Sequence, residues 1–193
     1  MRYKPEQKEQ TRRRIIIAAA RSFRKAGYSG IGVDGLAKGA NVTSGAFYGH
    51  FKSKEAVFKE VVADGLERLY SAIANFKQKF GEHWWEEFAN FYTSQKRTCD
   101  LTDACPLQTL TPEVGRSNEE IRAIFETGLL KVSKLASGEQ ADGASQEDRD
   151  KTWASLAMLI GGVTLARAVK DEELSKEIGT AVRNEVVASH KPE

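Results

Sequence analysis

Residues 36–55 read LAKGANVTSGAFYGHFKSKE, and this stretch decides the fold of the N-terminal part of the chain. We expect a short helix over residues 33–39, a second over residues 44–50, and a tight turn between them. Asn41 lies in this turn and tolerates the left-handed backbone conformation better than most non-glycine residues. Apolar residues recur where the two helices would face each other, namely Leu36, Ala37, Ala40, Val42, Phe47 and Phe51. The pattern predicts a helix-turn-helix, whose second helix would fit the major groove of DNA, about 12 Å wide.

A longer helix is expected just upstream, over residues 7–26. Ile15, Ala19 and Phe23 recur every fourth residue in this segment, and arginines surround them. Gly27 follows at the position where a left-handed residue commonly closes a helix. Together with the helix-turn-helix, this segment predicts a three-helix head at the N-terminus.

Charge is divided unevenly along the chain. Residues 1–60 carry 13 Lys and Arg against 5 Asp and Glu, a net +8, whereas residues 61–193 carry 16 against 22, a net −6. A basic N-terminal segment joined to an acidic body favours a polyanion as the partner of the N-terminal part.

At this point the sequence resembles the DNA-binding signature of the TetR family of transcriptional regulators (TetR/AcrR type). The resemblance covers about residues 8–62, roughly a third of the chain. The residues that fall in register with the family pattern are Gly45, Tyr48, Phe51, Lys52, Ser53 and Lys54. The chain departs from the pattern at Asn41, where the family usually has glycine, and at Gly32-Val33, where a Ser or Thr helix cap is common.

The resemblance implies a role for individual residues of the head. The residues expected to contact DNA are Thr43, Ser44, Gly45, Ala46, Tyr48, His50 and Lys54. Arg12, Arg13 and Arg14 would add contacts to the DNA backbone, whereas Phe47 and Phe51 would pack inward. A single short helix binds weakly, so two copies of the chain and a palindromic operator are expected. By family habit the protein would be a repressor that a small apolar or aromatic effector releases from DNA.

Helical periodicity continues through the rest of the chain. Ser53 can cap a helix whose apolar face carries Ala56, Phe58, Val61, Val62, Leu66 and Leu69. Further helices are expected over residues 82–97, 103–111, 146–169 and 172–188. Pro112 is expected to end the helix at 103–111. Ser117 and Glu120 have the spacing of a capping box, which predicts the start of the next helix. Residues 138–145 are expected to form a polar loop. Because no strand alternation appears, we expect an all-α fold of about nine helices.

The C-terminal body, residues 54–193, is expected to bind the effector and to form the dimer, whereas residues 1–53 form the DNA-binding domain. The resemblance implies an effector chamber in the middle helices, with Trp84, Phe88, Phe91, Tyr92, Cys105, Phe125 and Trp153 as lining residues. Plain core packing is the alternative for each of them. Apolar and small residues around the segment 153–169 predict burial on both sides. The expected dimer seam consists of Leu156, Gly161, Leu165, Leu174, Ile178 and Val182, and a monomer with one buried central helix is the alternative.

Two other functional classes stay open on the residues alone. One is an enzyme that acts on a small aromatic substrate in the same pocket, although no nucleophile and base pair is identifiable. The other is a helical protein-interaction module, which would leave the basic segment unexplained. The string GIGVDG at residues 30–35 matches a dinucleotide fingerprint, but it follows a predicted helix rather than a strand.

The sequence predicts no catalytic residue, no metal site and no cofactor. Cys99 and Cys105 form no Cys-x-x-Cys pair, and the three histidines are scattered. The charged start of the chain does not resemble a signal peptide, and the uncharged run at 153–166 is short for a membrane span of about 20 residues. We therefore expect a cytoplasmic protein whose partners are double-stranded DNA, a second copy of the chain and a small-molecule effector.

Overall fold

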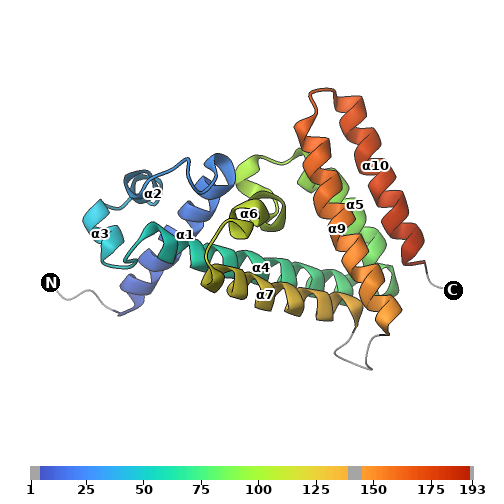
Figure 1. Ribbon diagram of the computed structural model, residues 1–193, viewed down its shortest axis with the longest axis horizontal. Coiled ribbons are helices and arrows are strands. Elements are labelled where there is room, and N and C mark those ends of the chain that lie inside the picture. Colours follow the sequence, from blue (N-terminus) through green and yellow to red (C-terminus); the bar gives the residue numbers. More distant parts are fainter. Residues whose placement is uncertain (1–4, 139–144, 192–193) are drawn as a thin grey trace. The chain divides into compact units, whose positions relative to one another are not determined.

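The computed structural model describes residues 5–138 and 145–191, and it is all-α within these ranges (Figure 1). The described residues form nine α-helices and two short 3-10 helices, η1 and η2, and they contain no strand. Residues 139–144 of the expected polar loop lie outside the described part. The elements are α1 Pro5–Ala26, α2 Val33–Gly39, α3 Ser44–Tyr48, α4 Lys54–Phe80, η1 Gly81–His83, α5 Trp84–Thr98, η2 Leu101–Asp103, α6 Pro106–Gly115, α7 Glu119–Ser137, α9 Gln146–Ala168 and α10 Glu172–Ser189. The prediction of an all-α fold is confirmed.

The chain divides into two compact units, and neither is one continuous stretch of sequence. The first unit runs to Gly65 and also contains Leu101–Phe125, whereas the second contains Leu66–Asp100 and the chain from Glu126 onward. The expected domains, residues 1–53 and 54–193, were defined by function, whereas these two units are defined by contacts. The functional division therefore stays a prediction.

The core of the first unit forms where α1 packs on α2, η2 and α6. Ile15, Ala19 and Phe23 are fully buried, as their spacing predicts, and Gly27 closes α1 with a φ of +72°. The ring of Phe23 meets the ring of Phe58 from α4 edge-on, with centroids 5.2 Å apart. These buried apolar contacts give the first unit a core of its own.

Polar contacts join residues 101–125 to the rest of the first unit. Arg24 Nη1 donates to the carbonyl of Thr102 at 2.8 Å, and the backbone N–H of Tyr28 donates to Glu113 Oε1 at 3.3 Å. Because these partners lie more than 75 residues apart in the chain, local sequence patterns do not reveal the pairing.

The second unit is built on α5, α9 and α10, which pack against one another; α9 is orange and α10 red in Figure 1. The two last helices approach closely at Gly162, where an added Cβ would lie 2.4 Å from a methyl of Val182. At the end of α10 the imidazole of His190 stacks on Trp85 of α5, with ring centroids 4.2 Å apart. No helix in the described ranges, α9 included, combines the length and the hydrophobicity that crossing a bilayer requires.

Two local predictions in the middle of the chain are wrong. Pro112 lies inside α6, which continues to Gly115, instead of ending that helix. Asn118, rather than Ser117, caps α7, because its Oδ1 accepts from the N–H of Ile121 at 3.1 Å, whereas the Ser117 hydroxyl donates back to the carbonyl of Glu113. Glu120 forms an ion pair with Lys59 instead of closing a capping box.

Candidate nucleic-acid interface

The helix-turn-helix forms as the sequence predicts, and backbone hydrogen bonds close its turn. The N–H groups of Ala40, Asn41 and Val42 donate to the carbonyls of Leu36, Lys38 and Ala37 in turn, each at 3.0 Å. Asn41 adopts a φ of +54°, and it is the only non-glycine residue with positive φ in the described part of the chain. Asparagine therefore takes the left-handed position that glycine usually takes in the family pattern.

Buried aromatic residues on the inner face hold α3 in place. Phe47 is fully buried and Phe51 is 3 % exposed, and their rings lie 5.8 Å apart. Thr43 caps α3, because its Oγ1 accepts from the N–H of Ala46 at 3.1 Å. The helix ends at Tyr48, so His50 lies in the turn beyond α3 and not on it, contrary to the range expected from the sequence.

The outer face of α3 is open. Thr43, Gly45, Ala46 and Tyr48 are exposed, and Tyr48 exposes 56 % of its surface. A Cβ added at Gly45 would meet a single neighbour, Thr43 Oγ1, at 3.9 Å. The described residues of the protomer leave this face open, so a partner molecule can approach it.

Ser44 is held by a residue that the sequence analysis does not single out. Its hydroxyl donates to Oδ1 of Asp34, in the first turn of α2, at 2.6 Å. The two residues are ten positions apart, and only the angle between α2 and α3 brings them together. No sequence signal marks Asp34, because an acidic residue near a helix N-terminus is common for other reasons.

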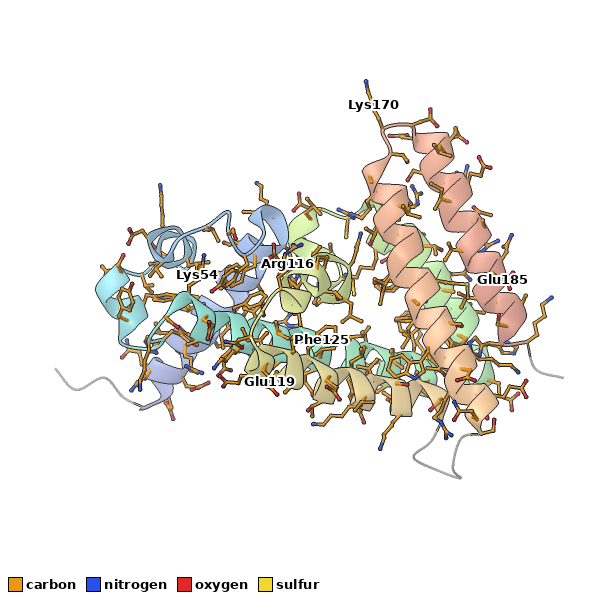
Figure 2. All side chains as sticks on the ribbon, viewed as in Figure 1. Lys54, Arg116, Glu119, Phe125, Lys170 and Glu185 are labelled. Atoms are coloured by element: carbon orange, nitrogen blue, oxygen red, sulfur yellow. The ribbon has the colours of Figure 1, made fainter. Side chains whose placement is uncertain are left out.

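Lys54 faces into the head (Figure 2). Its ammonium donates to the carbonyls of Tyr28 at 2.9 Å and Ile31 at 3.2 Å, and it lies 4.3 Å from the centre of the Tyr28 ring. The side chain therefore holds the segment between α1 and α2. An ammonium carries three donors, so two carbonyls leave one for a further acceptor.

His50 and Arg12 form a second junction at the edge of the head. Arg12 donates to the carbonyl of His50 at 3.1 Å and to Glu60 Oε1 at 2.6 Å, and its guanidinium lies 4.3 Å from the centre of the Phe51 ring. Partial burial, with the nearby charges of Lys8 and Arg12, lowers the pKa of His50 below its usual value. The His50 imidazole is therefore neutral at pH 7. Arg13 and Arg14, by contrast, are exposed.

The residues expected to line an effector chamber are only partly brought together. Trp84, Phe88 and Tyr92 are buried in the second unit and form an aromatic cluster in which Trp84 and Phe88 have centroids 6.1 Å apart, and Phe88 and Tyr92 5.7 Å apart. Phe76 connects Phe91 to this cluster, because its ring centroid lies 5.4 Å from that of Phe91 and 5.4 Å from that of Phe88. Trp153 is 37 % exposed on α9. Cys105, which is buried, and Phe125 belong to the first unit.

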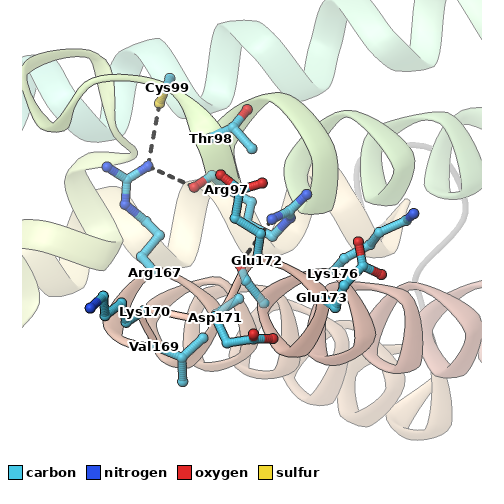
Figure 3. Close-up of a pocket in the computed structure, with 12 residues that line it drawn as sticks. Arg97, Thr98, Cys99, Arg167, Val169, Lys170, Asp171, Glu172, Glu173 and Lys176 are labelled. Atoms are coloured by element: carbon cyan, nitrogen blue, oxygen red, sulfur yellow. Dashed lines mark hydrogen bonds between the residues drawn. The ribbon is translucent and has the colours of Figure 1, made fainter.

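A polar cleft of about 540 Å³ opens in the second unit where α5 and α9 end and α10 begins (Figure 3). Arg167 Nη1 donates to the carbonyls of Lys96 and Arg97 at 2.9 and 3.1 Å and lies 3.7 Å from Cys99 Sγ. Arg97 in turn donates to the hydroxyl of Ser175 at 2.8 Å. Both guanidiniums thus secure the end of α5. Charged residues of both signs line the cleft, which therefore differs in character from the apolar chamber expected.

The residues expected to form a dimer seam differ in exposure. Leu165 is 63 % and Leu174 43 % exposed, and Gly161 faces open space. Leu156 is buried within the protomer, whereas Ile178 and Val182 are half-buried, and Val182 contacts Gly162. The second unit therefore presents large apolar side chains to its surroundings on α9 and at the start of α10.

Comparison with known proteins agrees with this architecture. Residues 15–61 match the family described as bacterial regulatory proteins, tetR family. The transcriptional repressor KstR2 of Mycolicibacterium smegmatis is 36% identical over an alignment of 212 residues that covers 86% of this chain and 97% of the relative. The transcriptional repressor DhaR of Mycobacterium sp. (strain GP1) is 24% identical over 141 residues, covering 71% of each chain.

Solved structures have the same fold. The reduced form of NemR from E. coli superposes with a TM-score of 0.77 at 20% identity, covering 92% of this chain and 95% of that one. FadR from Bacillus subtilis, in complex with stearoyl-CoA, superposes with a TM-score of 0.68 at 18% identity, covering 92% and 98%.

The two named relatives are both described as transcriptional repressors. Together with the braced α2–α3 pair and the match over residues 15–61, they assign this chain a regulatory rather than a catalytic role. The chain belongs to the TetR family of transcriptional regulators.

Proposed function

We propose that this regulator is a ligand-responsive repressor that binds a palindromic operator as a homodimer. The observation that carries the proposal is the one-sided burial of α3. Its inner residue Phe47 is fully buried, whereas its outer residue Tyr48 is 56 % exposed. A helix held in this way can enter the major groove without losing its support. The net +8 of residues 1–60 supplies the attraction to phosphates.

The proposed DNA contacts divide by the chemistry of each side chain. Thr43, Ser44 and Ala46 would face base edges and sugars, and Gly45 would let the DNA backbone come close. The Tyr48 hydroxyl would bond a phosphate at the groove edge. His50, neutral and tied through its carbonyl to Arg12, would approach the same edge.

Lys54 enters the proposal with a double role. Two of its donors hold the segment after α1, and the third is available for a phosphate. Arg13 and Arg14 would add sequence-independent contacts, because both are exposed on the basic segment.

The proposed dimer forms through α9 and α10. Leu165 and Leu174 expose apolar surface that a monomer would leave in water, and burial of such surface is the main driving force for association. A homodimer formed in this way would carry two copies of α3, one for each half of an operator. Half-sites would then be related as a palindrome.

The proposed effector binds in the second unit. The aromatic cluster of Trp84, Phe88 and Tyr92 offers flat apolar surface, and the cleft beside Arg97 and Arg167 offers hydrogen-bond donors. FadR, one of the structural neighbours, is described in complex with stearoyl-CoA. An effector would release DNA only by binding one spacing of the two α3 helices more tightly than the other, and a few kcal/mol of difference suffices. Such a regulator would act in the cytoplasm, beside the DNA it binds.

A mobility-shift titration tests the DNA-binding proposal. The probe is a duplex from the region upstream of the protein's own gene, with excess unrelated DNA as competitor and with two salt concentrations. We expect a shifted band that survives the competitor and that weakens steeply as salt rises. The variant Tyr48→Ala should bind at least tenfold more weakly, whereas Leu130→Ala, an exposed position on α7, should bind as the wild type does. Equal binding to operator and competitor DNA would contradict the proposal.

A further inference from the structure

The two hydroxyls at the start of α3 are held with opposite hydrogen-bond polarity. Thr43 Oγ1 accepts from the N–H of Ala46 at 3.1 Å, and that bond uses a lone pair and leaves the hydroxyl hydrogen to be donated. Ser44 Oγ donates to Asp34 Oδ1 at 2.6 Å, and that bond uses the hydrogen and leaves the lone pairs. A hydroxyl carries one hydrogen and two lone pairs, so these adjacent groups present different faces to a partner.

The direction of the bond between Asp34 and Ser44 follows from chemistry. An ionised carboxylate can only accept, so the hydrogen between the two oxygens comes from Ser44. The separation of 2.6 Å is typical of a charge-assisted O–H···O⁻ bond, which is about twice as strong as a neutral one. Ser44 is therefore an acceptor toward a molecule that approaches the start of α3.

An acceptor at this position can bond only some groups in the major groove. Adenine N6 and cytosine N4 are amino donors, whereas thymine O4 and guanine O6 and N7 are acceptors. Phosphate oxygens also accept. Ser44 thus has no hydrogen to offer a keto base or a phosphate, although serine is otherwise a reader that tolerates either kind of base.

We infer that Asp34 is a specificity-determining residue of this regulator. By taking the hydrogen of Ser44, Asp34 makes Ser44 select adenine or cytosine over guanine or thymine at one strand position in each half-site. The inference rests on the proposed function, because it requires α3 to lie in the major groove. It goes beyond that function in assigning a base preference, and in assigning it to a residue on α2.

Selection from a library of randomised duplex DNA tests the inference. Four proteins are compared: the wild type, Ser44→Ala, Asp34→Ala, and Glu86→Ala, which removes an exposed carboxylate in the second unit. Removing a carboxylate near DNA strengthens binding to all sequences alike, so the readout is the relative base preference at each position. The wild type and Glu86→Ala should select an amino base at the Ser44 position.

Ser44→Ala should lose that preference. Asp34→Ala should accept keto bases there, since its Ser44 hydroxyl can rotate and donate. An unchanged preference in either variant overturns the inference. A wild type that selects no duplex at all overturns the proposed function instead, so the two failures are distinguishable.

A change in the DNA gives a test that needs no Asp34 variant. In the selected duplex, the amino base at the Ser44 position is replaced by the analogue that lacks its exocyclic amino group. Losing one hydrogen bond should weaken binding of the wild type by about 3- to 10-fold. The same replacement should change binding of Ser44→Ala by less than about twofold, because that protein has no acceptor to leave unpaired. Equal losses for the two proteins would exclude a bond from Ser44 to the amino group.

Discussion

Gly45 is a residue whose identity the protomer itself does not require. Its backbone is helical with negative φ, and an added Cβ would find open space except for Thr43 Oγ1 at 3.9 Å. Some other glycines are fixed by packing; a Cβ at Gly65, for example, would lie 2.8 Å from Pro106. A glycine that the fold leaves free is consistent with a constraint from outside the protomer, and the proposed constraint is DNA.

Gly45→Gln should therefore fold normally and bind the operator at least tenfold more weakly. The longer side chain would stand where the DNA backbone is proposed to come close, and tenfold corresponds to about 1.4 kcal/mol. Gly115→Gln is the matched control, because a Cβ there also meets no atom within 4 Å. Binding is measured by mobility shift and folding by thermal unfolding. Undiminished binding by Gly45→Gln would exclude a close approach of DNA at this residue.

His190 shows how a residue near the C-terminus contributes to stability. Its Nε2 lies 2.9 Å from the hydroxyl of Ser155, and its ring stacks on Trp85. Burial, helped by the charge of Lys151 and opposed by that of Asp148, lowers its pKa from 6.5 to about 4. The folded protein therefore holds a neutral imidazole at pH values where the unfolded chain has already bound a proton.

The free energy of unfolding should fall as the pH drops from about 6.5 toward 4, because the unfolded state takes up the proton first. His190→Gln removes this titration, so its stability should depend less on pH over the same range. Urea titrations at several pH values measure the difference. His83→Gln, which removes an exposed imidazole, is the control and should keep the wild-type slope. A parallel slope in His190→Gln would show that other groups cause the pH dependence.

At the scale of elements, the approach of α9 to α10 depends on one missing side chain. Gly162 lies where a Cβ would be 2.4 Å from a Val182 methyl and 3.1 Å from its Cβ. Valine is stiff about χ1, so it cannot easily move aside. Gly161, its neighbour in sequence, meets no atom within 4 Å.

Gly162→Ala should lower the free energy of unfolding by about 1–3 kcal/mol, the usual range for an overfilled core. Gly161→Ala should not destabilise the protomer, because alanine favours helix and the added methyl meets nothing there. The double variant Gly162→Ala with Val182→Ala should recover part of the loss by removing the clashing methyls. Chemical denaturation measures all four proteins. A loss that the second substitution does not reduce would place the strain elsewhere.

The start of α7 could not be predicted from local sequence rules. Ser117 and Glu120 have the spacing of a capping box, but Lys59 pairs with Glu120, and Asn118 caps α7. Asn118 also donates to Glu55 Oε1 at 3.0 Å, a residue 63 positions away. Local spacing alone does not decide which of two adjacent residues caps a helix, because hydrogen bonds and ion pairs to residues distant in the chain also contribute.

At the scale of the whole molecule, net charge is divided along the chain. The net +8 lies in residues 1–60 and the net −6 in the remainder. The large exposed apolar residues of α9 and α10 are Trp153, Leu165 and Leu174, all in the second unit. The basic N-terminal part suits the proposed binding of DNA, and the exposed leucines of α9 and α10 suit the proposed dimer.

Leu165→Glu should convert the proposed dimer to monomer, because it places a charge where apolar surface would be buried. Sedimentation velocity should show at least a tenfold weaker association, and operator affinity should fall with it. Leu130→Glu changes a leucine that is 45 % exposed on α7 and should leave both properties as in the wild type. A monomeric wild type, or a dimer that persists in Leu165→Glu, would contradict the proposed seam.

The sequence by itself determined the all-α class, the bounds of α2 and α10 to within a residue, the turn at Asn41 and the inward packing of Phe47 and Phe51. These features follow from local spacing, since helical periodicity and turn chemistry act over a few residues. The outer face of α3 was predictable for the same reason.

Only the tertiary structure decided which distant residues meet. It brought residues 101–125 into the first unit and directed the Lys54 ammonium at two backbone carbonyls. It also placed Asp34 against Ser44 and brought the rings of Trp84 and Phe88 together in the second unit. Each of these pairings depends on the angles at which helices cross, and crossing angles are set by how whole apolar faces interlock rather than by any short stretch of chain.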